Sequence, residues 1–470
     1  MPSANATTGP ERTGTAAMEP LLQSFSEEVA PVDPVALFRH AQTTMGAAAY
    51  WERPQDAAVL VGMGAAQQIT LQGIAPSAWV FGEASREWQR LMVGARTSGA
   101  GAAGPLLLGG FAFDPLRPTT EAWNGFPAGL LTLPCILYRQ AGGLATVTYS
   151  VVLPPGMVTE RAFRSLRDTW FSARAEARAG STPDRLQPPT PNPQFSERSA
   201  SDPWQRLVAD AAQEVQAGQL EKVVLARQLR LPADAVVDAA SALTRLRAGT
   251  TSGLIFAIAS GGRCFLGATP ERLVRLQSAT VTTAALAGSR RRGATTMEDA
   301  ALEQELLRSN KDRWEHAIVV RELTDGLTAA GVVLPPTPRS VVMKLGTVQH
   351  LYTPLSGTVE DDCTILDLLE RLHPTPAVGG YPRSDALAWI RCHEGIDRGW
   401  YAGPVGWIDT EGDGDFAVGI RSALLDRYGA TLYAGCGIMG DSRPEDEFAE
   451  SELKLRPMLA ALQRSGAWIR

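Results

Sequence analysis

Apolar and polar positions along the chain follow two periods, which predicts a mixture of helices and strands. Helical spacing occurs in PVALFRHAQT and WQRLVADAAQEVQAG, whereas AAVLVGMGAA and EKVVLARQLRL alternate as strands do. The segment TMEDAALEQELLRSNKDRWEHAIVVRELTDGL predicts a long helical stretch with one interruption near Ser309 and Asn310. Near the end, FAVGIRSALL, TLYAGCGIM and EDEFAESELKLRPMLAALQ predict a strand, a second strand and a helix.

Proline, glycine and small polar residues divide this pattern. Residues 1–18 predict a disordered tail. The stretch 181–201 is rich in Pro and Ser, so it is neither a helix nor a central strand. It separates a front part, 19–180, from a back part, 203–458, and is either a domain boundary or a surface loop within one domain. In 105–114 a Gly pair inside an apolar run predicts a bulge or a close backbone approach.

Composition narrows the class of protein. Of the 470 residues 44% are hydrophobic and 20% are charged, which is typical of a globular chain. A net charge of -6 gives no reason to expect nucleic-acid or anionic-membrane binding, so an acidic ligand would need a local cationic pocket. Five unclustered cysteines argue against a disulfide framework or a structural zinc site. No export signal and no membrane-length apolar run is visible, which predicts a cytoplasmic protein.

Two pairs of carboxylates are the first candidates for chemistry. Asp312 and Glu315 are spaced i, i+3, as are Glu447 and Glu450, so each pair shares one helical face. Lys454 follows Glu450 by four residues on the same face. Spacing alone favours two solvated faces with an ordinary ion pair. The alternative is a magnesium site to which each helix supplies oxygen ligands.

The sequence segments around these carboxylate pairs resemble those of a known enzyme family. Nine segments across 203–458 resemble, in order, the chorismate-utilising enzymes, which are the isochorismate, salicylate, anthranilate and aminodeoxychorismate synthases. The segments are KVVLARQ, FLGATPERL, LAGSRRRG, DRWEH, LHPTPAVGG, GWYAGPVGW, FAVGIRSA, AGCGIM and PEDEFAESELK. In the front part the match is weak and rests mainly on GGFAFD.

The resemblance implies a fold and a substrate. The fold is α/β (α+β), a large single domain over 19–470 with two stacked, mainly antiparallel sheets surrounded by helices, and 181–201 then becomes a loop. The substrate is chorismate, a dianion. Mg²⁺ is expected on Glu315 and Glu450, with Asp312 and Glu447 as further or water-mediated ligands. For the second substrate carboxylate the resemblance implies Arg421, Tyr401, the backbone N–H near Gly435, and Lys454.

Individual residues then favour one reaction of the family. Isochorismate forms when water attacks C2 of the ring and the C4 hydroxyl leaves, which requires a base and an acid. By resemblance Lys222 is the base and Glu271 the acid. As a base, Lys222 must be neutral near pH 7, and as an acid Glu271 must have a raised pKa. Without the resemblance Lys222 would be a solvated strand residue and Glu271 an ordinary surface carboxylate.

Further positions concern the product. Ala287 stands where the aminodeoxychorismate branch carries a nucleophilic Lys. Ala377 stands where the salicylate, anthranilate and aminodeoxychorismate branches generally carry Thr. His350 matches an active-site histidine of the family, and Gly288 and Ser289 are expected to contact the substrate. The resemblance therefore favours an enzyme that stops at isochorismate. A salicylate synthase and a non-catalytic binding subunit stay as alternatives.

Because water rather than ammonia is the expected nucleophile, no glutamine amidotransferase subunit is expected. The resemblance favours a monomer. Isochorismate feeds menaquinone, catecholate siderophores and salicylate-derived products, so the pathway stays open.

Overall fold

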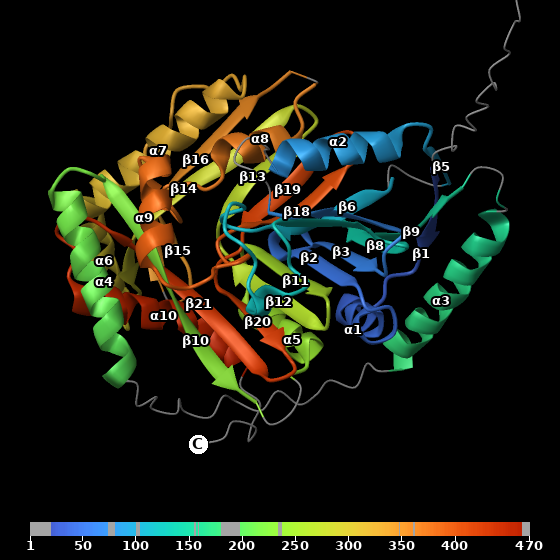
Figure 1. The fold of residues 1–470 in the computed structure, drawn as a ribbon, viewed down its shortest axis with the longest axis horizontal. Coiled ribbons are helices and arrows are strands. Elements are labelled where there is room, and N and C mark those ends of the chain that lie inside the picture. The colour runs from blue at the N-terminus through green and yellow to red at the C-terminus, as the bar shows by residue number, and fades with distance from the viewer. Residues whose placement is uncertain are drawn as a thin grey trace, which may run out of the picture.

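The computed structural model describes residues 20–73, 80–99, 104–154, 157, 159–179, 198–233, 237–346, 348–360 and 362–462. The predicted tail at 1–18 and nearly all of the Pro-rich stretch at 181–201 lie outside the described residues. Two large sheets lie in the middle of the molecule, with helices on both sides (Figure 1).

The first sheet has twelve strands in the order β17-β10-β21-β20-β12-β11-β2-β3-β8-β9-β1-β5. Among the described strands only β1 and β5 pair in parallel. The bounds of its strands are β1 (Leu21–Val29), β2 (Ala48–Arg53), β3 (Ala58–Met63), β5 (Arg96–Gly99), β8 (Ile136–Ala141), β9 (Leu144–Leu153), β10 (Lys222–Pro232), β11 (Leu254–Ser260), β12 (Arg263–Thr269), β17 (Gly380–Tyr381), β20 (Ser422–Asp426) and β21 (Gly429–Ile438).

The second sheet has nine strands in the order β15-β16-β14-β13-β19-β18-β6-β7-β4. The bounds of its strands are β4 (Gln67–Leu71), β6 (Leu106–Phe111), β7 (Gly129–Leu133), β13 (Arg272–Gln277), β14 (Thr280–Arg291), β15 (Val341–Lys344), β16 (Val348–Thr358), β18 (Pro404–Asp409) and β19 (Gly414–Val418). The expected fold, with two mainly antiparallel sheets and surrounding helices, is confirmed.

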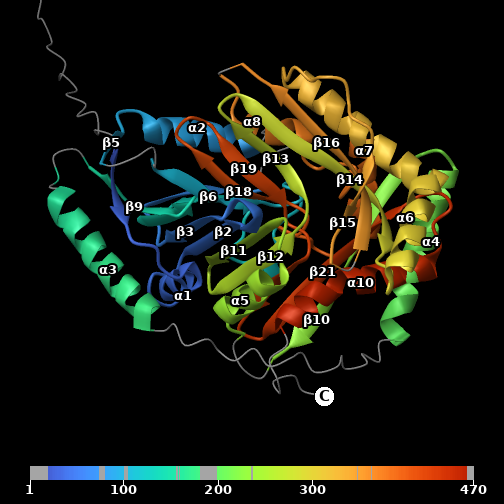
Figure 2. The same ribbon diagram turned by 180° about the vertical axis from the view of Figure 1, so that it is seen from behind.

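Ten α-helices are described, and they cover the sheets from two sides (Figures 1 and 2). One apolar cluster joins side chains of both sheets with α2, α7 and α8, and a second lies between the twelve-stranded sheet and α1, α3, α5 and α10. The helices are α1 (Pro34–Thr44), α2 (Val80–Met92), α3 (Thr159–Ala179), α4 (Arg198–Gln216), α5 (Ala239–Gly249), α6 (Thr296–Arg308), α7 (Asn310–Ala329), α8 (Ile365–Leu372), α9 (Arg383–His393) and α10 (Pro444–Leu462). Among these residues no helix is long and apolar enough to cross a membrane.

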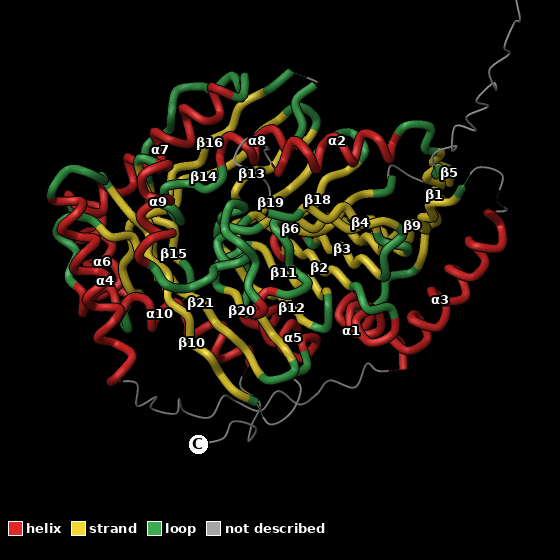
Figure 3. Tube along the Cα trace, viewed as in Figure 1, coloured by secondary structure: helices red, strands yellow, loops and turns green. Residues whose placement is uncertain are grey.

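Strands from the front and back parts of the chain pair with each other in both sheets (Figure 3). In the first sheet β2 pairs with β11, and in the second sheet β6 pairs with β18. This shared hydrogen bonding supports our proposal that 19–470 forms one domain, because neither part completes a sheet without the other.

Local sequence signals explain several elements. The predicted interruption is present, since α6 ends at Arg308 and the hydroxyl of Ser309 accepts a hydrogen bond from the N–H of Asp312 to cap α7. The Gly pair of β6 is a close approach. A side chain at Gly109 would overlap the carbonyl of Leu130, and one at Gly110 would overlap that of Pro404.

One element departs from the prediction. FAVGIRSALL was expected to form a single strand, but the chain leaves β19 after Val418 and enters β20 at Ser422, in the other sheet. Arg421, at the break, has φ +50°, a conformation that strands do not use. The prediction of one strand is wrong here because both halves are strands that are buried almost throughout, and a buried strand pattern carries no signal for a change of sheet.

Candidate active site

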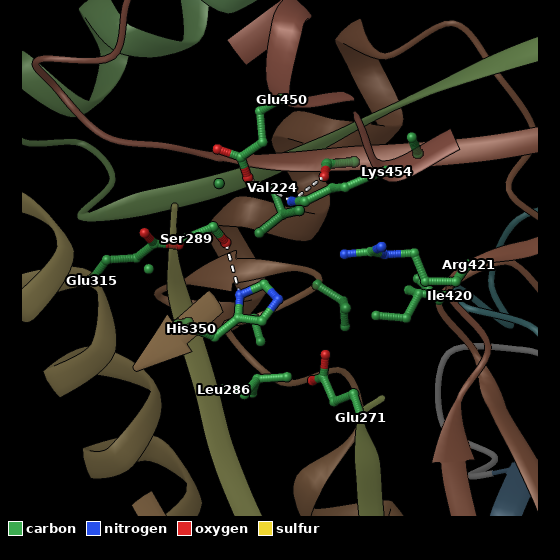
Figure 4. Close-up of a pocket in the computed structure, with 18 of the residues that line it drawn as sticks. Val224, Glu271, Leu286, Ser289, Glu315, His350, Ile420, Arg421, Glu450 and Lys454 are labelled. Atoms are coloured by element: carbon green, nitrogen blue, oxygen red, sulfur yellow. Dashed lines mark hydrogen bonds and ion pairs between the residues drawn. The ribbon is translucent and has the colours of Figure 1, made fainter. Parts of the chain in front are cut away.

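A cavity lies where the ends of the two sheets meet α7 and α10 (Figure 4). It brings together residues from many separated stretches of the back part. With one exception, all candidate site residues line it: Glu271, Ala287, Gly288, Ser289, Asp312, Glu315, His350, Ala377, Tyr401, Arg421, Gly435, Glu447, Glu450 and Lys454. The exception is Lys222, which lies behind the wall.

One side of the cavity is cationic. Arg421 projects into it from the crossing between β19 and β20 (Figure 4). Lys454 reaches it from α10, where its Nζ lies 2.7 Å from Glu450 and donates to the carbonyl of Gly435 at 2.8 Å. Burial opposes the charge on Lys454, but Glu450 outweighs it, so the pKa of the ammonium is raised. This is the local positive pocket that an acidic protein needs to bind an anion.

Tyr401 completes this side. Its ring stacks on that of Tyr433 at 5.1 Å between centroids, and burial raises the pKa of its phenol to about 12. The phenol therefore stays protonated and can donate a hydrogen bond.

Glu271 stands between Pro270 and the first residue of β13, and its carboxyl points into the cavity (Figure 4). Burial raises its pKa to about 7, against the opposing charges of Lys222, Lys454 and Arg421. A carboxyl with that pKa is partly protonated at neutral pH, which is the property that a general acid requires.

His350 and Ser289 form a second polar group. The backbone of β14 bulges between Ala287 and Ser289, and Gly288 takes up the extra residue with φ +75°. The bulge aims Ser289 at His350, with 2.9 Å between its Oγ and the Nδ1 of the imidazole. Burial lowers the pKa of His350 to about 3, so the ring is neutral. Its Nε2 has no hydrogen-bond partner among the described residues and is available to a ligand.

The acidic residues of α7 and α10 lie on the remaining walls. Each of the four carboxylates is paired with a cation. The pairs are Asp312 with Arg290 at 3.0 Å, Glu315 with Lys222 at 2.8 Å, Glu447 with Lys311 at 3.1 Å, and Glu450 with Lys454 at 2.7 Å. Burial and the neighbouring charge of Glu450 raise the pKa of Glu447. The two carboxylates of α10 are therefore close enough to repel each other.

These carboxylates fit a hard divalent cation by their chemistry, because all of their donors are oxygens and all four line one cavity. Their present geometry is that of ion pairs. Within the described ranges no three acidic, histidine or cysteine side chains converge closely enough to enclose a metal. A metal would therefore have to draw these oxygens away from their lysine and arginine partners.

Lys222 occupies a layer behind Glu315. It is fully buried at the start of β10, and its Nζ reaches the cavity only through the 2.8 Å contact with Glu315. Gly437, on the neighbouring strand β21, leaves room for this pair. A Cβ at that position would lie 2.5 Å from Oε1 of Glu315 and 2.9 Å from Cε of Lys222.

We expect Gly437→Ala to lower kcat by roughly 10²-fold, because the added methyl displaces both members of the pair and misplacement of about 1 Å has that cost. The substitution introduces no backbone strain, since Gly437 has an ordinary strand φ. Steady-state kinetics beside Gly249→Ala, where a Cβ meets nothing within 4 Å, provides the measurement and its control. Equal kcat values for the two variants would contradict the prediction.

Four charged residues near the cavity are not among those predicted from the sequence. Arg290 and Lys311 pair with predicted metal ligands. Their sequence positions could have pointed to them, since Arg290 lies in the segment LAGSRRRG and Lys311 directly precedes Asp312. The buried pair of Glu394 and Arg398 had no such signal. The two residues lie four positions apart, but the backbone groups that their side chains hold, at Val224, Ala226 and Val378, are 20 or more residues away.

Comparison with known proteins shows the family to which the chain belongs. The family model of the chorismate binding enzymes matches residues 11–463. The chain belongs to this family. The resemblance of its nine segments is thereby confirmed.

Relatives of this chorismate-binding enzyme match over nearly its whole length. The salicylate biosynthesis isochorismate synthase of Pseudomonas aeruginosa is 40% identical over 451 residues, which cover 95% of this chain and 91% of that protein. The isochorismate synthase MenF of Bacillus subtilis is 33% identical over 449 residues, with 94% and 93% covered.

Among solved structures, the menaquinone-specific isochorismate synthase MenF of Escherichia coli superposes with a TM-score of 0.73 at 25% identity, and the match covers 95% of this chain and 96% of that one. Component I of anthranilate synthase from Streptococcus pneumoniae superposes with a TM-score of 0.64 at 19% identity, covering 87% and 92%. This second likeness concerns the fold alone.

Proposed function

We propose that this chorismate-binding enzyme converts chorismate to isochorismate. The observation that carries the proposal is a buried carboxyl, Glu271, whose pKa is raised to about 7 and which shares one cavity with the cationic groups of Arg421 and Lys454. An acid poised at neutral pH beside an anion-binding wall suits the protonation of a leaving hydroxyl on an anionic substrate. The names of the relatives from Pseudomonas aeruginosa and Bacillus subtilis support the same reaction.

Each carboxylate of chorismate has a place in this proposal. The enolpyruvyl carboxylate accepts hydrogen bonds from Arg421, Tyr401, Lys454 and the backbone near Gly435, where a guanidinium offers the paired donors that a carboxylate prefers. The ring carboxylate faces the acidic helices. His350, Gly288 and Ser289 lie beside the ring, with the free Nε2 of His350 as a donor or acceptor.

The proton transfers balance. Lys222 takes a proton from the water that attacks C2, a C–O bond forms there, and the C4–O bond breaks as Glu271 protonates the departing oxygen. One water is consumed and one is released. Afterwards Lys222 is protonated and Glu271 is ionised, so one proton must return from the first to the second, through solvent, before the next cycle. Lys222 can act only when it is not held as an ammonium against Glu315.

We propose Mg²⁺ as the cofactor, held by Glu315 and Glu450 with Asp312 and Glu447 as further or water-mediated ligands. Bound there, the ion would offset the negative charge of the acidic helices toward the ring carboxylate of the substrate. The side chains of the protein do the rest. Arg421, Tyr401 and Lys454 orient the substrate, and Lys222 and Glu271 move protons.

Small side chains favour isochorismate as the end point. Ala287 offers no amine for covalent catalysis, and both it and Ala377 line the cavity without a hydroxyl. We also propose that the enzyme works in the cytoplasm as a monomer, without an amidotransferase subunit, because water is the nucleophile.

Incubation of the purified protein with chorismate and Mg²⁺, followed by chromatographic separation, tests the function. Isochorismate as the accumulating product supports it. Salicylate with one equivalent of pyruvate would make the chain a salicylate synthase. No conversion, with chorismate binding intact, would favour a non-catalytic binding subunit.

With Lys222 in the neutral form that the proposed mechanism requires, we expect kcat/KM to fall by about tenfold per pH unit above the pKa of Glu271, since only the protonated form of Glu271 can donate. That pKa is about 7, so the loss begins near neutrality and increases with pH. His350, with a pKa of about 3, and Tyr401, with a pKa of about 12, do not titrate in this window. A pH–rate profile from 6 to 9 is the measurement, and a flat profile would contradict the assignment of Glu271.

A further inference from the structure

A buried ion pair outside the roles described so far joins Glu394, which caps the end of α9, to Arg398. Their side chains are 0% and 3% exposed, and both carboxylate oxygens of Glu394 accept hydrogen bonds from the guanidinium. Burying two charges costs desolvation that their attraction only partly offsets, so such a pair is weak support for a purely stabilising role. Its remaining hydrogen bonds indicate another purpose.

Those hydrogen bonds go to the backbone of two segments of the cavity wall. Arg398 donates through Nη2 to the carbonyl of Val224 at 2.6 Å and through Nη1 to that of Val378 at 2.9 Å. Glu394 accepts the N–H of Ala226 at 2.7 Å. Val224, Val378 and Arg398 itself all line the cavity. The pair therefore ties strand β10 to the loop that carries Ala377.

Strand β10 needs this tie because its neighbour on that side is very short. β17 pairs with β10 only at Lys222 and Val223, and the N–H of Val224 then donates to Gly379. Beyond that point the carbonyl of Val224 and the N–H of Ala226 have no strand opposite them and would be buried polar groups without partners. The pair of side chains replaces the missing strand.

We infer that Glu394 and Arg398 are positioning residues of the active site. They hold the first residues of β10, and with them Lys222, at a set distance from the neighbouring Ala377–Val378 loop of the cavity wall. Arg398 also accepts, through its carbonyl, the N–H of Tyr401 at 2.8 Å. Its guanidinium lies 4.2 Å from the centre of the Phe113 ring, which fixes its plane. The effect on turnover rests on the proposed function, whereas the fastening of β10 does not.

The substitutions Arg398→Lys and Arg398→Gln test this inference. Lysine keeps the charge opposite Glu394, but its single ammonium cannot replace the planar fork that reaches the carboxylate and two carbonyls. We expect kcat to fall about 10²-fold in both variants, as for other displacements of about 1 Å. KM for chorismate should change by less than about threefold, since Arg421 and Lys454 stay in place.

Arg247→Gln is the matched control. Arg247 makes the same two-pronged contact with Glu52, at 2.7 and 2.9 Å, and neither residue lines the cavity. It should lower Tm without lowering kcat, and all rates are compared well below the lowest Tm. Hydrogen exchange of a peptide spanning 222–228 is the second readout, and we expect it to accelerate in the Arg398 variants and not in the control.

Two results would overturn the inference: a kcat within about twofold of the wild-type value in folded Arg398→Lys, or unchanged exchange in 222–228. A wild-type kcat in Arg398→Lys would mean that Arg398 only compensates the charge of Glu394. If Arg398→Gln does not fold, Glu394→Gln, which removes the charge and keeps the shape, takes its place. If the wild-type protein makes another product from chorismate, the proposed function is refuted. The positioning role would still be decided by hydrogen exchange in 222–228 and by the ratio of the rates at which variant and wild-type protein consume chorismate.

Discussion

Replacing Glu271 by Gln is expected to lower kcat by about 10²–10⁴-fold, because the amide cannot protonate the leaving hydroxyl and general acid catalysis contributes that much. Binding of chorismate should survive, since the charges of Arg421 and Lys454 are untouched. Steady-state kinetics together with calorimetric titration of chorismate separates the two effects. Loss of binding along with turnover would make Glu271 a structural residue.

The same substitution carries an internal control on stability. The pKa of Glu271 is raised by burial to about 7, above its usual 4.5, so ionised Glu271 destabilises the folded state. The stability that its neutral form preserves is present at low pH and is lost as pH rises through about 7. Glu271→Gln should therefore raise Tm at pH 8 and change it less at pH 5. An inactive variant with a higher Tm cannot owe its inactivity to unfolding.

Replacing Lys222 by Ala is expected to lower kcat by a comparable factor of about 10²–10⁴, because the proposed mechanism then lacks the base that takes a proton from the attacking water. Tm should also fall, since Glu315 loses its partner at 2.8 Å and a buried side chain leaves a cavity. Kinetics and thermal unfolding are the measurements.

Lys222→Met separates chemistry from packing. It keeps most of the buried volume and removes the ammonium, so it should recover part of the lost Tm and none of the lost kcat. Retained turnover in Lys222→Met would exclude Lys222 as the base. Product that forms only when ammonia is added to the wild-type protein would equally contradict a base that activates water.

Local patterns in the sequence were sufficient for the helices and strands that run without interruption. α7 and α10 follow from their spacing, and the i, i+3 pairs of Asp312 with Glu315 and Glu447 with Glu450 do face one cavity. This succeeded because the period of a helix fixes which side chains share a face. The resemblance supplied the meaning of those faces, which spacing alone assigned to solvent.

Contacts between distant segments could not be predicted in this way. The route of the chain from β19 in one sheet to β20 in the other places Arg421 in the cavity, although the pattern predicted one continuous strand. The partners of the four carboxylates come from β10, β14, α7 and α10. The position of Lys222 in a layer behind Glu315 could not be predicted from the sequence either.

The sequence by itself determined the periods of the elements, the acidic faces of two helices and the set of residues shared with the chorismate-utilising enzymes. Only the tertiary structure decided the environment of each group. It buried Glu271 and so raised its pKa to about 7, it held Lys222 against Glu315, and it tied β10 in place through Glu394 and Arg398. The reason is physical: periodicity acts between neighbours in the chain, whereas desolvation and ion pairing depend on which distant segments the fold brings together.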